Sequence, residues 1–344
     1  MSKAAELAAL IGSQTALSNR NVIINGAFQC SQRGTSTTGG GFLVDRFELN
    51  INNTDNIAIT QSQDSSGPSG FANSWKILAT TAESAVAADE RVRFRQNIEG
   101  QNLQQFAFGT SAAKSMTLSF YVKSNKTGTY AVNLEQDDAS RVIGSTYTIS
   151  SADTWEFKTI TVGGDTSGTI NDDNGAGLIV SWYLLAGSNY TATDNTSYGA
   201  SADGKQAYGH STTWGQATND NFFITGIQLE VGEQATPFEH RSFADELLRC
   251  QRYFFRTGAF SYFLMGRWHH NNGSPLASFN LPTTMRAAQG VSVSTAFASG
   301  SGYTGTPTFG DFDPNNFTIA SATSRNANDV QWANTGKLDI SAEL

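Results

Sequence analysis

Four aromatic residues stand in a stretch of the chain that is otherwise polar. The segment 187 to 221 is poor in apolar residues and rich in Gly, Asp, Asn, Thr and Ser. Aromatic rings can stack on the apolar face of a sugar while amide and carboxylate side chains bind its hydroxyl groups. The segment therefore supplies candidates for glycan binding, which are Tyr190, Tyr198, Tyr208 and Trp214.

Paired acidic residues are a second group that could do chemistry. Glycoside cleavage commonly uses two carboxylates held about 5 to 10 Å apart. Asp137 with Asp138, and Asp172 with Asp173, are sequence neighbours, and neighbours on a strand point to opposite faces. We expect these pairs to be turn formers or solvated charges, so the chain is predicted not to be an enzyme. The loop at Asp172 and Asp173 could instead hold calcium, because that ion prefers oxygen ligands.

The histidines and cysteines form no recognised metal or redox motif. His269 and His270 are neighbours, a spacing that does not suit convergence on one metal from a strand. Cys30 and Cys250 stand in no Cys-x-x-Cys or Cys/His spacing. We therefore predict no cofactor apart from the calcium alternative, and we predict that both cysteines are buried apolar residues.

The composition argues against two classes of partner. The 344 residues are 39% hydrophobic and 15% charged, with a formal net charge of −8. Duplex nucleic-acid binding relies on clustered Lys and Arg, and we identify no such cluster in the sequence. No apolar run reaches the roughly 18 to 20 residues that span a bilayer, and no signal peptide is evident. We expect neither a nucleic-acid partner nor membrane insertion.

Short β-rich segments separated by turn formers must position these residues. Met116, Leu118, Phe120 and Val122 alternate strictly, which predicts a strand with one buried face. No helical pattern intervenes between the segments, so a mainly β jelly-roll β-sandwich is expected over residues 21 to 241. The predicted strands are 42 to 49, 58 to 61, 74 to 79, 92 to 98, 116 to 122, 130 to 134, 155 to 162, 178 to 185 and 222 to 231.

The polar segments 163 to 177 and 187 to 221 are expected to be long surface loops at the ends of the sandwich, or disordered spacers. Trp182 lies in an apolar strand and is expected in the core rather than in a binding site.

A short N-terminal helix and a linking helix flank the sandwich. Residues 1 to 20 contain good helix formers, with Leu7, Leu10 and Ile11 at helical spacing. We predict that this helix docks on another protein surface, and a frayed terminus is the alternative. The segment 242 to 256 opens with a capping-box pattern and has helical apolar spacing, which predicts the linking helix. Strand patterns resume over 257 to 344, the predicted smaller C-terminal β-sandwich domain.

Four stretches of the chain resemble a family of tailed-bacteriophage virion proteins. They are NVIINGAFQCSQRGT at 21 to 35 with VDRF at 44 to 47, IQLEVGEQATPFEHRSFADELLRCQRY at 227 to 253, LPTTMRAAQGVSVS at 281 to 294, and ISAEL at 340 to 344. The chain is similar to the tail-fibre or carbohydrate-binding-like structural proteins of environmental phages. Where the family more often carries Trp and Tyr, this chain has Phe47 and Phe254, which keep aromatic bulk.

Two of these stretches also have a structural interpretation. Ile227, Leu229 and Val231 alternate as the core face of a strand that leads into the linking helix, so we expect mainly a scaffold there, with direct binding as the alternative. Residues 45 to 46 beside 32 to 33 are predicted to form a charge pair that closes the first strands.

The resemblance implies a virion structural protein with a jelly-roll domain and a β-rich tip, and it supplies no catalytic residues. We expect a tail-fibre or attachment subunit, made in the host cytoplasm and assembled as a homotrimer in the virion tail. Its expected partners are other virion proteins of the tail or adaptor and host cell-surface polysaccharide. The alternatives are a capsid-decoration or head-to-tail joining protein that binds only virion proteins, and a polysaccharide depolymerase.

Overall fold

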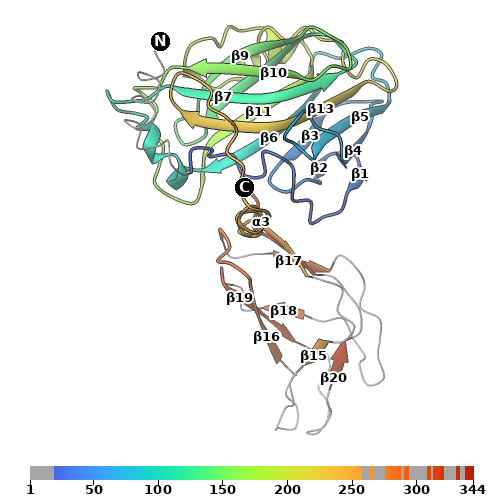
Figure 1. Ribbon diagram of the computed structural model, residues 1–344, viewed down its shortest axis with the longest axis vertical. Coiled ribbons are helices and arrows are strands. Elements are labelled where there is room, and N and C mark those ends of the chain that lie inside the picture. The colour runs from blue at the N-terminus through green and yellow to red at the C-terminus, as the bar shows by residue number, and fades with distance from the viewer. Residues whose placement is uncertain are drawn as a thin grey trace. The chain divides into compact units, whose positions relative to one another are not determined.

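The protein divides into two compact units, Met1–Phe243 and Ala244–Leu344, which Figure 1 draws as ribbons. A computed structural model describes residues 19–257, 263–265, 276–287, 290–293, 308–310, 313–320, 331–333 and 338–344. The predicted docking residues Leu7, Leu10 and Ile11 lie outside the described residues. Within the described parts of the chain, no helix is long and apolar enough to cross a membrane.

The first unit consists of two antiparallel sheets (Figure 1). Sheet A has the order β1-β4-β5-β13-β7-β10, and sheet B has the order β12-β9-β8-β11-β6-β3-β2. Sheet A comprises β1 (Ser36–Thr38), β4 (Ala58–Asp64), β5 (Ser74–Thr81), β7 (Met116–Ser124), β10 (Glu156–Val162) and β13 (Asn221–Val231). Sheet B comprises β2 (Gly41–Phe42), β3 (Glu48–Asn52), β6 (Arg91–Glu99), β8 (Gly128–Gln136), β9 (Arg141–Ile149), β11 (Ala176–Ala186) and β12 (Gly199–Ala200). The predicted mainly β, jelly-roll type of sandwich is confirmed.

Large aromatic side chains from both sheets fill the core between them. Trp75 of sheet A lies 5.2 Å, ring to ring, from Phe94 of sheet B. Phe94 stacks on Trp182 at 5.1 Å, and Trp182 meets Phe120 of sheet A edge-on at 5.9 Å. All four side chains are fully buried, which confirms the core position predicted for Trp182. Such ring contacts add to the free energy that comes from burying the rings themselves.

Alternation decides which strand residues face this core. Met116, Leu118, Phe120 and Val122 are all buried in the main cluster, as their spacing predicts. Ile227 and Leu229 are also buried there, with Val231 packed against the cluster. The core-facing position predicted for Ile227 and Leu229 is confirmed, and Val231 is half-buried at the edge of the cluster.

The predicted charge pair near the start of the chain is present. Arg33 Nη1 lies 3.5 Å from Asp45 Oδ1, and Gln32 Nε2 donates to Asp45 Oδ2 at 2.9 Å. Asp45 is fully buried, so its carboxylate needs such donors.

Two parts of the sandwich differ from expectation. Strand β9 was not predicted, because Gly144 and the hydroxyl residues around it resemble a turn. The segment 187 to 221, expected as a loop, contains α2 (Ser188–Thr191), β12 and the 3-10 helix η3 (Asp203–Lys205). Two further 3-10 turns, η1 (Gly100–Asn102) and η2 (Gln104–Phe106), follow β6.

The second unit begins around α3 (Phe243–Gln251) and continues as short antiparallel strands. The predicted helix over 242 to 256 is too long, because Phe254–Arg256 form strand β14, where Arg256 pairs with Asp339 at 2.6 Å. The sheets are β14-β21-β17, β15-β20 and β16-β19-β18. Their remaining bounds are β15 (Phe263–Met265), β16 (Leu276–Asn280), β17 (Gly290–Val293), β18 (Thr308–Gly310), β19 (Asn316–Ala320), β20 (Gln331–Ala333) and β21 (Leu338–Ser341).

The two cysteines are both buried, as predicted. Cys30 belongs to the first unit and is 2% exposed, whereas Cys250 lies on α3 and is 0% exposed. Both therefore act as small apolar side chains.

Candidate functional site

The four predicted aromatic residues do not form an exposed platform. Trp214 is 0% exposed and Tyr190 is 7% exposed. Tyr198 is half-buried and packs against the main core, with its ring 6.1 Å from that of Phe108. Tyr208 is 38% exposed and is the one of the four that faces solvent. The prediction is therefore wrong for Trp214 and Tyr190 as surface rings, because the polar segment that carries them folds back onto the sandwich.

Polar groups of the segment make this burial possible. Asp220 Oδ2 accepts hydrogen bonds from the Gly215 N–H at 3.0 Å and the Ala217 N–H at 3.1 Å, and these bonds close the turn after Trp214. Lys126 Nζ balances the Asp220 charge at 3.3 Å. The apolar surface that buries Trp214 comes from the main core, which a local sequence pattern does not reveal.

Residues 187–210, called here the covering segment, pack on the outer face of sheet B. The Gly144 N–H of β9 donates to Asn195 O at 2.7 Å. Tyr190 and Ala207 form a small buried cluster with Tyr183 of β11 and Ala131 of β8. The segment thus covers the β9, β8 and β11 side of this face.

Three arginines occupy the neighbouring strand of the same face. Arg91, Arg93 and Arg95 alternate along β6 with Val92 and Phe94, which point into the core. Arg93 is 9% exposed, while Arg91 and Arg95 are half-buried.

The sheet register places polar residues of three other strands beside these arginines. Arg93 lies opposite Asn50 of β3 and opposite Tyr183 of β11. Asn133 of β8 follows on the next strand, opposite Ser181 of β11. The arginine face is defined here as Asn50, Arg91, Arg93, Arg95, Asn133 and Tyr183.

The hydroxyl of Tyr183 links this face to the covering segment. It accepts hydrogen bonds from Arg93 Nη1 at 3.3 Å and from Asn133 Nδ2 at 3.1 Å. Asn133 Nδ2 also donates to Gln206 O at 3.0 Å. The guanidinium of Arg93 is therefore held against a neutral phenol, with its remaining N–H groups not used by that contact.

The other two arginines have different partners. Arg91 donates to Asn52 Oδ1 at 3.1 Å and to Gln206 Oε1, and its guanidinium lies 4.6 Å from the centre of the Tyr190 ring. Arg95 forms an ion pair with Glu48, at 2.8 Å between Nε and Oε2. Burial, and then the charge of Arg93, lower the pKa of Arg91.

Several buried polar atoms of the arginine face lack a hydrogen-bond partner among the described residues. They are Arg93 Nε, Arg91 Nε, Asn50 Oδ1 and Asn133 Oδ1. Buried polar atoms normally have partners, because an unmet donor or acceptor costs about 1 to 3 kcal/mol. These four atoms are closed to solvent, so the accessible part of the face is the surface of the half-buried Arg91 and Arg95 beside them.

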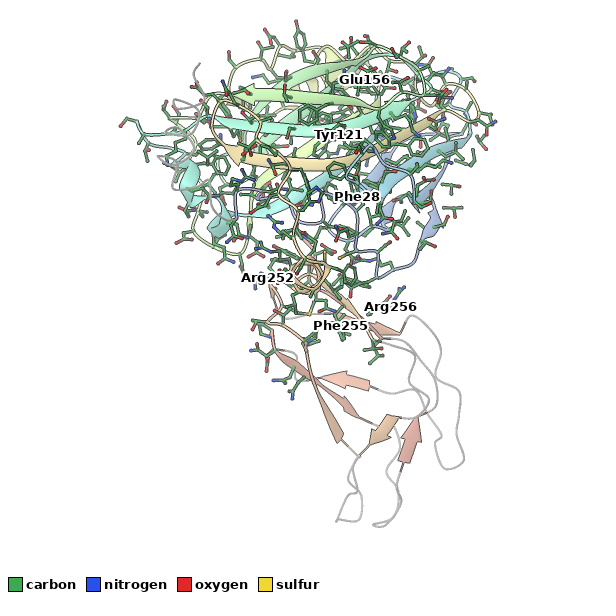
Figure 2. All side chains as sticks on the ribbon, viewed as in Figure 1. Phe28, Tyr121, Glu156, Arg252, Phe255 and Arg256 are labelled. Carbon is green, nitrogen blue, oxygen red and sulfur yellow. The ribbon has the colours of Figure 1, made fainter. Side chains whose placement is uncertain are left out.

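The outer face of sheet A carries a second group of aromatic residues, called here the aromatic row. Figure 2 labels Tyr121, which lies on β7 between β13 and the edge strand β10. Its ring lies 4.8 Å from that of Phe157, which is 48% exposed, and 5.5 Å from that of Phe71. Phe238 and His240 contact Phe71 at 5.0 and 5.3 Å and complete the row.

The candidate calcium loop acts as a turn in this structure. Asp173 Oδ1 accepts a hydrogen bond from the Gly175 N–H at 2.8 Å, and both Asp172 and Asp173 are exposed. Asp138 Oδ2 similarly accepts a hydrogen bond from the Asn171 N–H at 2.9 Å. Over the described part of the chain, no group of three or more His, Cys, Asp or Glu side chains could hold a metal.

The arginine face was missed at the sequence level, although one signal for it is visible. The letters RVRFR at 91 to 95 place arginine at every second position across the start of the strand predicted over 92 to 98. That spacing puts three cations on one face, so the statement that the chain has no arginine cluster is wrong. The partners Asn133 and Tyr183 could not be found this way, because they come from distant strands.

Comparisons with known proteins identify no family for the chain. No family model matches it, and no curated protein matches it either. Solved structures with similar parts include the enzymatically active domain of tailspike protein 4 from bacteriophage CBA120, with 13% identity, a TM-score of 0.33, and coverage of 62% of this chain and 22% of that chain. The match thus spans about a fifth of the tailspike.

Two carbohydrate-binding modules are also similar. The first, TmCBM61 in complex with β-1,4-galactotriose, has 13% identity and a TM-score of 0.29, over 62% of this chain and 100% of that chain. The second is the C-terminal family 22 module of Clostridium thermocellum Xyn10B, with 13% identity and a TM-score of 0.31, over 64% of this chain and 99% of that chain. Scores of this size assign no ligand, activity or partner to this chain.

Proposed function

We propose that the first unit binds carbohydrate through the arginine face of sheet B. The observation that supports this most is the line of three arginines on one sheet face, with Asn50 and Tyr183 opposite Arg93 and with Arg91 and Arg95 half-buried. Saccharide hydroxyls are donors and acceptors, and a few precisely placed polar groups beside aromatic rings are typical of sites that bind them. A rigid sheet holds such groups in position better than a loop does.

In this proposal the chain is a tail-fibre or attachment subunit of a phage, assembled as a homotrimer in the virion tail, and its ligand is host cell-surface polysaccharide. The resemblance of four stretches of the sequence to phage structural proteins supports this role. The tail or adaptor proteins would be its partners in the particle.

The proposal is one of binding rather than cleavage. Buried carboxylates of the first unit are engaged in structural hydrogen bonds: Asp165 accepts two from Arg141, at 2.6 and 3.1 Å. Glu83 accepts from the N–H of Asn56 at 2.8 Å. Burial alone would raise the pKa of Asp165, but Arg141 and its other donors lower it. A carboxyl with a lowered pKa is a poor proton donor at neutral pH.

The test is to measure binding of the full chain to an array of bacterial surface polysaccharides, and then to compare Arg93→Gln with Phe157→Ala. We expect the Arg93 variant to lose at least about tenfold in affinity while the Phe157 variant stays close to the parent. Unfolding curves establish that both variants are folded.

Each other outcome has a definite meaning. Loss of binding only in the Phe157 variant would move the site to the aromatic row. No binding to any glycan, together with cryo-electron microscopy that places the chain on the head or between subunits, would favour the capsid-decoration or joining role. Shortening of the polysaccharide would instead establish a depolymerase.

A further inference from the structure

We infer that the arginine face recognises an acidic saccharide, through a carboxylate such as that of a uronate residue. This inference rests on the proposed function and narrows its ligand. It comes from the three positive charges of Arg91, Arg93 and Arg95 on this face. A neutral sugar needs hydrogen-bond donors and acceptors but no positive charge.

The three guanidinium groups are close together on one strand. Alternate residues of a strand are about 7 Å apart, so Arg91, Arg93 and Arg95 form a short line of like charges. Placing cations in partly buried positions next to each other is unfavourable unless anions compensate them. The chain as a whole carries a net charge of −8, so general solubility does not require a cationic strand.

The acidic side chains near this line do not balance it fully. Glu48 pairs with Arg95 at 2.8 Å. Asp203 has a favourable electrostatic effect on Arg91, and its Oδ1 accepts from Gln206 Nε2 at 2.9 Å. Arg93 has the phenol of Tyr183 as its hydrogen-bond partner, at 3.3 Å. Among the described residues, the central and most buried of the three arginines is therefore the one without a carboxylate partner.

The guanidinium of Arg93 has a shape that suits a planar anion. A guanidinium presents N–H donors in a fixed fork that binds both oxygens of a carboxylate, which a neutral hydroxyl does not offer. Arg93 Nε is buried and has no partner among the described residues, and the residue as a whole is 9% exposed, so a ligand would have to bind the remaining exposed edge of the guanidinium. Asn50, opposite Arg93 on β3, adds an amide beside the same position.

The test uses isothermal titration of the full chain with polygalacturonate, alginate and hyaluronate oligosaccharides, each beside its carboxyl-reduced form. Reduction keeps the sugar backbone and removes the charge. We expect at least one acidic form to bind about tenfold or more tightly than its reduced form, and the preference to shrink as NaCl is raised. A sulfated glycan is included to establish whether any polyanion suffices.

Three variants assign the effect to the face. Arg93→Gln should lose the preference for the acidic form, and Arg93→Lys should keep part of it. Arg20→Gln should keep all of it, because the Arg20 guanidinium donates to Pro237 O, which is not part of the face. Equal binding of acidic and reduced forms, or a preference unchanged in Arg93→Gln, overturns the inference while leaving glycan binding intact. Equal binding of the sulfated glycan overturns the carboxylate assignment. No binding of any saccharide overturns both the inference and the proposed function.

Discussion

The pKa of His210 is strongly altered by the position of this residue in the fold. His210 lies within the segment predicted to be a surface loop, yet its Nδ1 accepts the Ala131 N–H of β8 at 3.3 Å and its ring meets Tyr130 edge-on at 5.9 Å. Burial lowers the pKa of His210 from 6.5 to about 4. The folded protein therefore keeps this imidazole neutral at pH values where an unfolded chain would protonate it.

The unfolding free energy of the first unit should decrease as the pH is lowered, because the unfolded chain binds a proton at His210 before the folded chain does. Between pH 6.5 and about 4 the unfolded state binds the proton and the folded state does not, so stability is lost as pH falls below 6.5. At about pH 4.5 the loss from His210 amounts to about 2 to 3 kcal/mol. Urea unfolding of the parent and of His210→Gln at about pH 7 and pH 4.5 measures it. An equal loss in both proteins would contradict the assignment.

Substitution of Trp214 and of Tyr208 by Ala should have very different effects on the unfolding free energy, although both residues belong to the same polar segment. Trp214 is 0% exposed and Tyr208 is 38% exposed. Replacing a buried Trp by Ala removes apolar contacts and leaves a cavity, so Trp214→Ala should lose about 3 to 5 kcal/mol of unfolding free energy. Tyr208→Ala should change it by about 0.5 kcal/mol or less. Equilibrium urea unfolding distinguishes them, and similar losses would contradict the burial of Trp214.

At the scale of elements, the contact between β9 and the covering segment shapes the outer face of sheet B. Gly144 permits this contact, because a Cβ there would lie 2.0 Å from Asn195 Nδ2. Asn195 is 2% exposed and its side chain donates to Lys205 O, so it has little room to move. The covering segment thus depends on the absence of a side chain at position 144.

Gly144→Ala should therefore loosen the covering segment. The added methyl group overpacks the contact, at an expected loss of about 1 to 3 kcal/mol. Hydrogen exchange should rise over residues 187–210 and stay low in β7 and β13. Gly163→Ala is the matched control, because a Cβ at 163 meets nothing within 4 Å. Equal exchange in the parent and Gly144→Ala would argue against a tight contact.

At the scale of the whole molecule, the two units have separate interiors. The first unit has its own aromatic core around Trp182. The second buries Tyr253, Phe254 and Ile340, where Phe255 of β14 pairs with Ile340 of β21. Units with separate cores can unfold independently.

Thermal unfolding by calorimetry should show two transitions that respond to different variants. Trp182→Ala should lower the transition of the first unit, and Tyr253→Ala that of the second, since each removes a large side chain from one core only. One transition shared by both variants would show that the units unfold together. Either result can be measured on the full chain.

The sequence by itself determined most long strands of the first unit and their buried faces, although it missed β9, because alternation is a local property. The alternating apolar residues of 116 to 122 and the apolar run around Trp182 predict the buried residues from a few neighbouring positions. The terminal docking residues and the phage role stay predictions.

Only the tertiary structure decided which polar-segment residues are exposed and where the candidate site lies. Trp214 and Tyr190 are buried because distant strands supply the surfaces that cover them. Arg93 of β6 meets Tyr183 of β11, and Asn133 of β8 reaches the same hydroxyl, because strand order brings these residues together. That order arises from pairing between segments far apart in the chain, which local propensities do not encode.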